Sequence, residues 1–191
     1  SRPTTIKDNQ TKQVSMLDAS QVTVSKQLIL QGYDFFYRSL TPVWSGEYKV
    51  AVQINIENKE KHGLGKPLPK GIVRVYKRDQ DGRAQFVGED SIDHTPKNET
   101  IKLHLGNAFD VTAERKQTAW RKADAVGKYS YAAESAFLIT TKTAKPEPVT
   151  VTVREPIPGD WEMLKESQPH EKPDAHTALW QIKIPAEGTS T

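Results

Sequence analysis

The chain has no cysteine among its 191 residues, and this absence excludes several kinds of protein at once. Without thiols there is no disulfide framework, no cysteine nucleophile and no cysteine-ligated zinc. The absence does not fix the compartment, because exported bacterial proteins and cytosolic proteins can both lack cysteine. The sequence starts at Ser1 without methionine, so we expect a mature or excised piece of a longer product, with any signal peptide upstream.

Long apolar runs and a strong charge of one sign are also missing. Runs such as LIL at 28–30 and AFLI at 136–139 are far shorter than the ~20 residues that a membrane-spanning helix needs. The formal net charge is only +3, from 27 basic and 24 acidic side chains. We therefore expect no transmembrane segment, no nucleic-acid ligand and no attraction to an anionic membrane.

The sequence instead shows repeated alternation of apolar and polar residues. In EYKVAVQINIEN, at 47–58, every second residue from Tyr48 to Ile56 is apolar, which is typical of a strand with one face on a core. Similar alternation occurs at 21–30, 71–77, 100–105, 135–142, 148–154 and 177–184. Turn-forming residues separate these runs, so we predict an all-β fold without long helices.

One segment, TAERKQTAWRKADA at 112–125, has a helix-forming composition but no apolar stripe. We predict a strand in its first half and a loop in its second half. Its centre, RKQTAWRK, mixes basic residues with Trp120, a pattern also used to bind single-stranded nucleic acid or acidic glycans. Because the net charge is low, we interpret this stretch as an edge strand that lysine and arginine protect from pairing.

An internal echo divides the chain. The segment PLPKG at 67–71 leads into a strand and is followed by Asp93-His94-Thr95 and IKLHLG. The segment PIPG at 156–159 leads into a second predicted strand, WEML, and is followed by Asp174-Ala175-His176-Thr177 and IKIPAEG. We interpret the echo as two tandem Ig-like antiparallel β-sandwich units, at 1–106 and 107–191. The first is open to a strand from upstream residues, and the second lacks its final strand.

The polar stretch GEDSIDHTPKNE, at 88–99, gathers four carboxylates around His94. A metal-dependent hydrolase at Asp93 and His94 would require another histidine or carboxylate to converge on them. Adjacent strand residues point to opposite faces, however, and Thr-Pro favours an extended backbone followed by a turn. We therefore expect a structural hydrogen bond between one of these two residues and a loop, with no metal or cofactor.

A second acidic motif, DQDG at 79–82, resembles a calcium loop only in its first residues. Its sixth and twelfth positions hold Ala84 and Asp90 instead of glycine and glutamate. Asp-Gly between alternating runs predicts a hairpin, because glycine adopts positive φ readily.

Three tryptophans, Trp44, Trp120 and Trp161, are candidate platforms for a sugar ring if they are exposed and roughly coplanar. The alternative is a structural role. For Trp161, which directly follows the PIPG loop, we favour a core position between sheets.

Three long runs resemble one bacterial family: GLGKPLPKGIVRVYKRDQDGRAQFVGEDSIDHTPKNE at 63–99, GNAFDVTAERKQT at 106–118, and EPVTVTVREPIPGDWEML at 147–164. They are similar to the C-terminal region of envelope proteins related to mucoidy inhibitor A, known as domain of unknown function 4139. The likeness extends from about Thr4 to the end. It implies export to the periplasm or outer envelope, because members generally carry a signal peptide, and it brings no established activity. Members usually continue past the PAEG-like turn with a further strand, whereas this sequence ends at Thr191, which would leave a sheet edge unpaired.

The sequence contains no nucleophile elbow, no HExxH and no phosphate loop. We therefore predict a non-enzymatic structural or protein-interaction module that binds an envelope protein, or itself, by strand addition at a sheet edge. A carbohydrate-binding module that uses exposed tryptophan and tyrosine is the alternative. A metal-dependent hydrolase around Asp93 and His94 is the third hypothesis.

Overall fold

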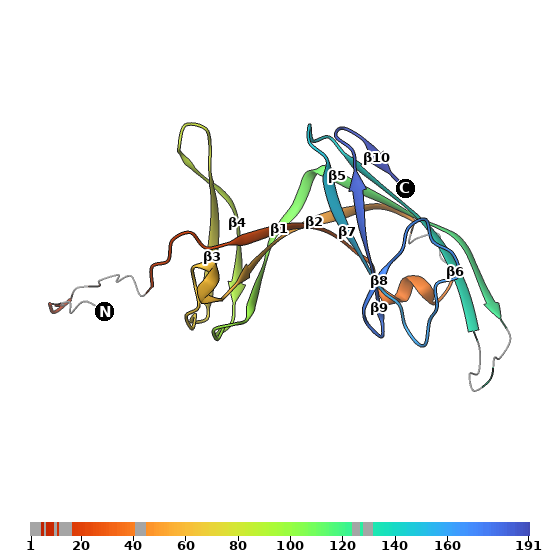
Figure 1. Ribbon diagram of the computed structural model, residues 1–191, viewed down its shortest axis with the longest axis horizontal. Coiled ribbons are helices and arrows are strands. Elements are labelled where there is room, and N and C mark those ends of the chain that lie inside the picture. Colours follow the sequence, from red (N-terminus) through yellow and green to blue (C-terminus); the bar gives the residue numbers. More distant parts are fainter. Residues whose placement is uncertain are drawn as a thin grey trace.

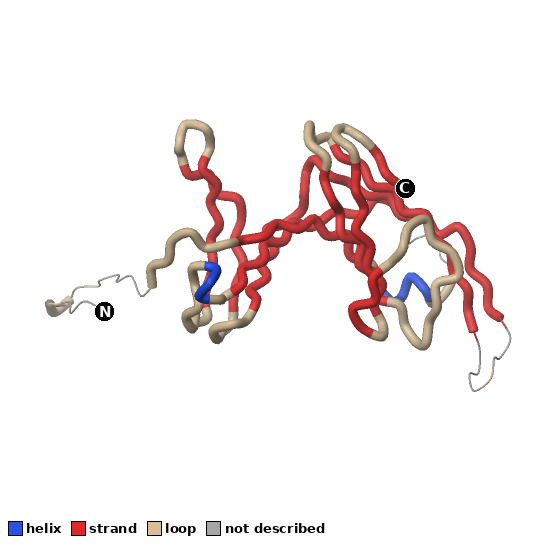
Figure 2. The backbone as a smooth tube through the Cα atoms, viewed as in Figure 1, coloured by secondary structure: helices blue, strands red, loops and turns tan. Residues whose placement is uncertain are grey.

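The computed structural model describes residues 5, 7–9, 11, 17–40, 45–123, 127 and 132–191. Within these ranges the chain forms strands, turns and two short 3-10 helices, and it has no α-helix (Figure 2). None of these helices is long and apolar enough to cross a membrane. The elements, in chain order, are β1 (Val24–Gln31), η1 (Asp34–Tyr37), β2 (Gly46–Glu57), η3 (Glu60–His62), β3 (Gly71–Arg78), β4 (Ala84–Ile92), β5 (Thr100–Ala123), β6 (Ala132–Thr143), β7 (Val149–Pro156), β8 (Glu171–Asp174), β9 (Thr177–Ile184) and β10 (Thr189–Ser190). The predicted all-β class is confirmed.

Eight strands form one sheet in the order β10-β6-β5-β2-β1-β7-β9-β8, and β3 and β4 form a separate hairpin. All neighbours in the large sheet are antiparallel except β1 and β7, which are parallel from Leu28 opposite Val151 to Gln31 opposite Arg154. The sheet is therefore mixed, which differs from the purely antiparallel arrangement that the sequence suggests. The parallel pair forms because β7 enters beside β1 after a long excursion through β2 to β6.

The molecule has two lobes joined by long strands (Figure 1). We call one the hairpin lobe: β3, β4 and the ends of β1, β2 and β5 that lie beside them. The other, the sheet lobe, contains β6 to β10, η1 and the remaining parts of β1, β2 and β5. The strand β5 runs without interruption through residues 106 and 107, where the sequence analysis places a unit boundary. That division stays a prediction.

The sheet lobe encloses the main core. The sheet curls so that β9 also contacts β6 and β10, and the inward side chains of five strands meet in a sandwich-like arrangement. The buried residues of this core are Leu28, Leu30, Val50, Val111, Ala113, Val151, Val153 and Ile184. Removal of such apolar side chains from water is the main contribution to stability.

The strand β5 corrects one prediction about the segment at 112–125 and confirms most of another. The second half of that segment is not a loop, because β5 continues to Ala123 and pairs with β6. The stretch at 115–122 is an edge strand as predicted except at Arg115, which lies between Gly46 of β2 and Ile139 of β6. Beyond Arg115, where β2 begins, β5 pairs with β6 alone among the described strands.

Two further predictions concern turns. The hairpin at DQDG is confirmed: β3 and β4 flank it, Gly82 has φ 78°, and the Asp79 carboxylate accepts a hydrogen bond from the Arg83 N–H at 2.8 Å. The predicted WEML strand at 161–164 is wrong, because this segment has turn and coil structure. The Trp161 indole N–H donates to the Ala175 carbonyl at 2.9 Å, which ties the loop to β8 and β9 instead.

Candidate functional site

Among the described residues, the outer edge of β6 lacks a partner strand over residues 132–139, and the Thr140 hydroxyl lies 3.2 Å from that of Thr191. On its inner side β6 pairs with β5 along its whole length, from Ala132 to Thr143. On its outer side β10 pairs with β6 only at Lys142 and Thr141. Within the described part of the chain, the backbone groups that residues 132–139 direct to this side are therefore open to an incoming strand.

The hydrogen bonds at the end of β6 show which residues face the open side. The Thr143 N–H donates outward to the Gly188 carbonyl at 3.0 Å, whereas the next N–H, that of Ala144, donates inward to Asp110 at 2.8 Å. In an antiparallel ladder, backbone direction alternates from one residue to the next. Odd-numbered residues of β6 therefore direct their N–H and C=O groups in the plane of the sheet, away from β5 and towards the open side; this direction is called outward below.

This alternation continues along β6 because the bulge in its ladder lies on β5, between Gln117 and Ala119. Ile139, Phe137 and Ser135 consequently present outward donors and acceptors in regular spacing. An added antiparallel strand can pair with them in the direction that β10 already takes.

The side chains of this edge do not protect it from pairing. Natural sheet edges commonly carry lysine or proline, and residues 132–140 contain neither. Their one charged residue, Glu134, accepts two hydrogen bonds from Arg121 of β5, at 2.7 and 2.8 Å. Leu138 is 47% exposed. The open part of this edge therefore carries no unpaired charged side chain among its own residues.

A buried ion pair lies behind the edge. Arg115 of β5 and Glu155 of β7 form a salt bridge, and each side chain is only 1% exposed. The Tyr37 hydroxyl, from η1, donates to Glu155 Oε2 at 2.7 Å. Gly32 leaves room for this carboxylate, because a β-carbon there would collide with it. The pair thus joins β5, β7 and η1 inside the sheet lobe.

Aromatic rings complete the surroundings of Arg115. Its guanidinium carbon lies 4.5 Å from the ring centre of Phe36 and 5.2 Å from that of Phe137, a residue of β6. These cation–π contacts accompany two guanidinium nitrogens, Nε and Nη1, that have no hydrogen-bond partner among the described residues. Burial lowers the pKa of Arg115. Phe137 thus connects the open strand to a closed, water-excluded cluster, which favours a structural role for the ion pair.

Burial raises the pKa of Tyr37 to about 12, above the usual value of 10. Because the pKa of Tyr37 is higher in the folded chain than in the unfolded chain, its protonated hydroxyl contributes to stability. This contribution is complete below pH 10 and is lost as the pH rises towards 12. We expect Tyr37→Phe to be less stable than the natural chain at pH 8, since it loses the bond to Glu155. The difference in unfolding free energy between the natural chain and Tyr37→Phe should narrow by up to about 2–3 kcal/mol between pH 10 and 12. Urea unfolding at each pH measures it, and a gap that is constant with pH would contradict the assignment.

Asp93 and His94 form no metal-binding cluster with the other described residues. Both are exposed; His94 Nδ1 accepts the Lys70 backbone N–H at 3.3 Å, and Asp93 pairs with the Lys70 ammonium at 3.1 Å. Across the described ranges, no cluster of three histidine, aspartate or glutamate side chains is placed to hold a metal ion. The contact of His94 with a loop backbone is the kind of hydrogen bond that the sequence predicts.

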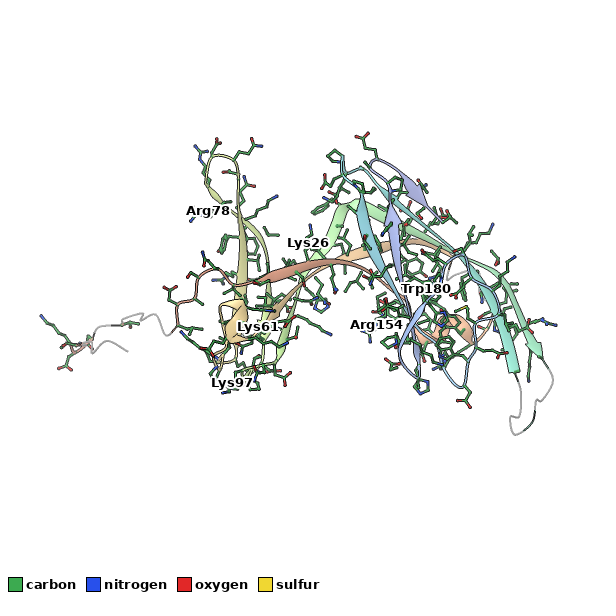
Figure 3. All side chains as sticks on the ribbon, in the orientation of Figure 1. Lys26, Lys61, Arg78, Lys97, Arg154 and Trp180 are labelled. Atoms are coloured by element: carbon green, nitrogen blue, oxygen red, sulfur yellow. The ribbon has the colours of Figure 1, made fainter. Side chains whose placement is uncertain are left out.

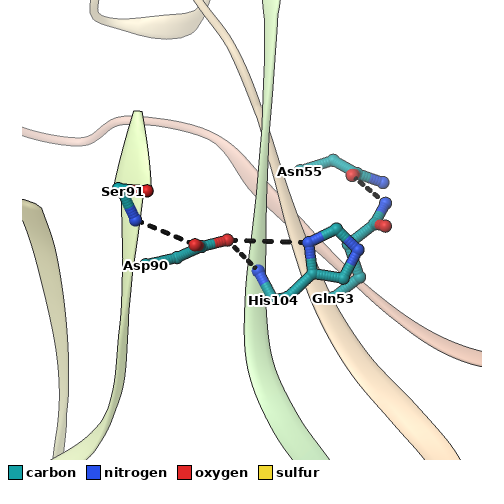
Figure 4. Close-up of polar contacts among 5 residues, drawn as sticks. All are labelled: Gln53, Asn55, Asp90, Ser91 and His104. Atoms are coloured by element: carbon teal, nitrogen blue, oxygen red, sulfur yellow. Dashed lines mark hydrogen bonds and ion pairs between the residues drawn. The ribbon is translucent and has the colours of Figure 1, made fainter. Parts of the chain in front are cut away.

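The carboxylate of Asp90 links β4 to β5 in the hairpin lobe. Asp90 of β4 accepts the backbone N–H of His104, on β5, at 2.8 Å and that of Ser91 at 2.8 Å (Figure 4). These two backbone bonds, the His104 one being the stronger effect, hold the pKa of Asp90 below its usual range. The acidic stretch at 88–99 thus supplies a bridge between β4 and β5.

Two of the three candidate tryptophans, Trp120 and Trp161, lie in the described residues, and each donates its indole N–H to a backbone carbonyl. Trp120 is half-buried and its N–H donates to the Tyr37 carbonyl at 3.2 Å. Trp161 is also half-buried, with the Lys172 ammonium 4.1 Å from its ring centre and the His170 ring 5.4 Å away. Trp44 lies outside the described residues.

The cluster of side chains around His170 was not predicted from the sequence. Its ring lies between those of Trp161 and Trp180, at 5.4 and 5.8 Å, and its Nδ1 is 2.9 Å from Glu166 Oε2. Trp180 lies in the sheet lobe, whereas Arg78 lies in the hairpin lobe (Figure 3). The cluster holds the loop at 157–170 against β9, which indicates packing.

Comparison with known proteins gives no match: no family model matches the chain, and neither does any curated protein or solved structure. The site is therefore defined by its own geometry. Sequence reasoning predicted a pairing edge but did not locate it on β6. It also missed the ion pair of Arg115 and Glu155. The available signal was Arg115 in an inward position of the alternation that includes Val111 and Ala113.

Proposed function

We propose that this chain is a non-enzymatic interaction module that binds an extended peptide strand along the outer edge of β6. The observation that carries the proposal is the row of outward backbone groups at Ile139, Phe137 and Ser135, next to the two residues that β10 already pairs. Main-chain hydrogen bonds supply the affinity in this mode of recognition, and side chains of alternate residues supply the selectivity.

The cellular setting of the proposal comes from the family resemblance. We place the module in an exported bacterial protein of the mucoidy-inhibitor-A-related family, in the periplasm or outer envelope, where it binds another envelope protein or itself. The all-β architecture is compatible with that family, and we retain two Ig-like units as part of this proposal. The sandwich-like sheet lobe supports it more directly than the hairpin lobe does.

The other two hypotheses have weaker geometric support. A glycan platform needs open aromatic faces, but Lys172 covers Trp161, and the Trp120 indole is tied to Tyr37. A metal-dependent hydrolase needs a converging third ligand, but the partner of both Asp93 and His94 is Lys70.

A strand attached to the C-terminus tests the proposal. β10 runs antiparallel to β6, with Ser190 opposite Thr141, so eight residues added after Thr191 would lie opposite Ile139 to Ala132. A valine–threonine repeat places the valine side chains on the face of the sheet that covers the core, beside the side chains of Ile139 and Phe137. Tethering raises the effective concentration of the strand. We expect this extended chain to melt at least about 4 °C higher than the natural chain, equivalent to ~1 kcal/mol or more.

Ser135→Pro is the matched control. It removes one outward N–H at an edge position, where proline is tolerated, so the natural chain, measured dilute enough to be monomeric, should keep its melting temperature. In the extended chain the same substitution should remove most of the gain. A melting temperature that the added strand leaves unchanged, or a gain that Ser135→Pro does not reduce, would contradict strand addition at β6.

A further inference from the structure

We propose that the peptide strand that binds along β6 carries an aromatic side chain opposite Ala136, on the face of the sheet turned away from the core. We call this face the solvent face. The inference rests on the proposed function, because it names the chemistry of the peptide that the same edge selects. The bound strand continues the ladder that β10 already forms with β6.

The alternation along β6 decides which side chains lie on the solvent face. Phe137 lies on the core side: the Arg115 guanidinium carbon and the Tyr37 ring centre are each 5.2 Å from its ring centre. Successive strand residues point to opposite faces, so the even-numbered side chains of β6 lie on the solvent face. Ala136 and Leu138 are both exposed there.

Two alanines separate the larger side chains of this face. The β5 residue opposite Ala136 is Ala119, and both alanines are exposed. The neighbouring row on one side contains Leu138, and the neighbouring row on the other side contains the pair of Arg121 and Glu134. Because an alanine side chain is a single methyl group, space remains above the sheet between these two rows.

Arg121 forms a flat border of this space. Its guanidinium donates from two nitrogens to the two carboxylate oxygens of Glu134, at 2.7 and 2.8 Å. Such a paired geometry fixes the plane of the guanidinium, and an aromatic ring can stack on that plane. The Arg121 side chain remains 71% exposed, so its surface is accessible to a bound peptide.

Leu138 forms an apolar border on the other side, with 47% of its surface exposed. The backbone groups of Ala136 point to β5, so Ala136 and the bound residue form a non-hydrogen-bonded pair, with α-carbons about 4.5 Å apart. The diagonal neighbours of the bound residue, Leu138 and Glu134, then lie about 7–8 Å away, within reach of an aromatic side chain. A ring opposite Ala136 can thus contact Leu138 and the Arg121–Glu134 pair and cover the alanines.

Charge favours an aromatic residue over an ionised one at this position. A charged side chain opposite Ala136 would meet both the cation of Arg121 and the anion of Glu134, so neither sign gains a net partner. An aromatic ring gains apolar burial against Leu138 and a cation–π contact with Arg121.

A change in the added strand tests the inference. In the extended chain, the fourth added residue is a threonine that lies opposite Ala136, because Ser190 lies opposite Thr141. We expect the version with tyrosine at this position to melt at least about 3 °C higher than the version with threonine. The backbone pairing is the same in both versions, so the difference reports on the side chain.

Three variants of the chain separate the contacts of the ring from its intrinsic preference for strands. Leu138→Ala and Arg121→Gln each remove one border, and each should reduce the gain from tyrosine by at least about half. Lys122→Gln is the matched control, because Lys122 lies opposite Ala133 and therefore on the core side of β5. It removes a neighbouring positive charge and should leave the gain unchanged.

Two results would overturn the inference while the proposed function stands. One is a tyrosine version that melts no higher than a threonine version that is itself more stable than the natural chain. The other is a gain from tyrosine that persists undiminished in both Leu138→Ala and Arg121→Gln, since that gain would come from strand preference alone. If neither added strand raises the melting temperature, the proposed function fails, and the inference fails with it.

Discussion

Replacing Glu155 by glutamine should lower the free energy of unfolding by about 3–5 kcal/mol, although the two side chains have the same size. The change leaves the Arg115 guanidinium buried, at 1% exposure, without the carboxylate that compensates its charge. Glutamine can still accept the Tyr37 hydroxyl hydrogen, so the loss comes mainly from the uncompensated charge. Urea unfolding measures the effect.

Two further variants show whether the loss in Glu155→Gln comes from the burial of the Arg115–Glu155 pair and from its unpaired charge. Glu89→Gln breaks the Arg74–Glu89 pair, whose side chains are 59% and 48% exposed, and should cost less than about 1 kcal/mol. Arg115→Met combined with Glu155→Gln removes both charges and should recover much of the stability. A loss of under about 1 kcal/mol for Glu155→Gln would show that water reaches the pair.

Asn58→Ala should destabilise the hairpin lobe by about 3 kcal/mol or more, because it leaves several backbone groups without partners. Asn58 is fully buried. Its side-chain amide donates to the carbonyls of Lys66 and Pro96, at 2.7 and 2.9 Å, and its carbonyl oxygen accepts the Lys66 N–H at 3.1 Å. One side chain thus fixes the two loops that follow β2 and precede β5.

Asn55→Ala is the matched control for this prediction. The Asn55 side-chain carbonyl oxygen accepts a hydrogen bond from the Gln53 side chain at 2.6 Å, within the same strand, and so does not link one loop to another. Its loss should cost about 1 kcal/mol or less. Equal losses for Asn55→Ala and Asn58→Ala in urea unfolding would contradict the role of Asn58 as a loop anchor.

The sequence allowed the strands to be predicted where alternation is strict and uninterrupted. The prediction at 47–58 matches β2, and the Asp-Gly turn locates the β3–β4 hairpin. Both features are local, because side-chain alternation and turn conformation depend on neighbouring residues. Such information fixes the fold class but does not fix which strands become neighbours.

The remaining features depend on contacts between distant residues. Arg115 and Glu155 are 40 positions apart, and charged residues are usually solvated, so neither looked like part of a core. With Arg115 counted as an inward residue, the alternation through Ala113 and Gln117 predicts the long β5. The WEML prediction failed because Trp161 bonds to a loop carbonyl in place of a ladder.

The candidate site likewise has one feature that the sequence shows locally and one that depends on contacts between distant residues. The absence of lysine and proline between 132 and 140 is visible in the sequence, but whether that stretch lies at an edge is decided by sheet order. The resemblance to a family with a further strand predicted an unpaired edge without naming its strand. The structure supplies the strand and the backbone phase of its residues.

Residue-resolved amide hydrogen exchange on β6 tests the central claim most directly, in the natural chain and in the chain with the added valine–threonine strand. In the natural chain, measured dilute enough to be monomeric, the outward amides of Ser135, Phe137 and Ile139 should exchange faster than the inward amides of Leu138 and Thr140. The added strand should slow the outward amides by at least about tenfold and leave the inward ones nearly unchanged. Outward amides that are already protected in the monomer, or that stay fast beside the added strand, would show that this edge does not accept a partner.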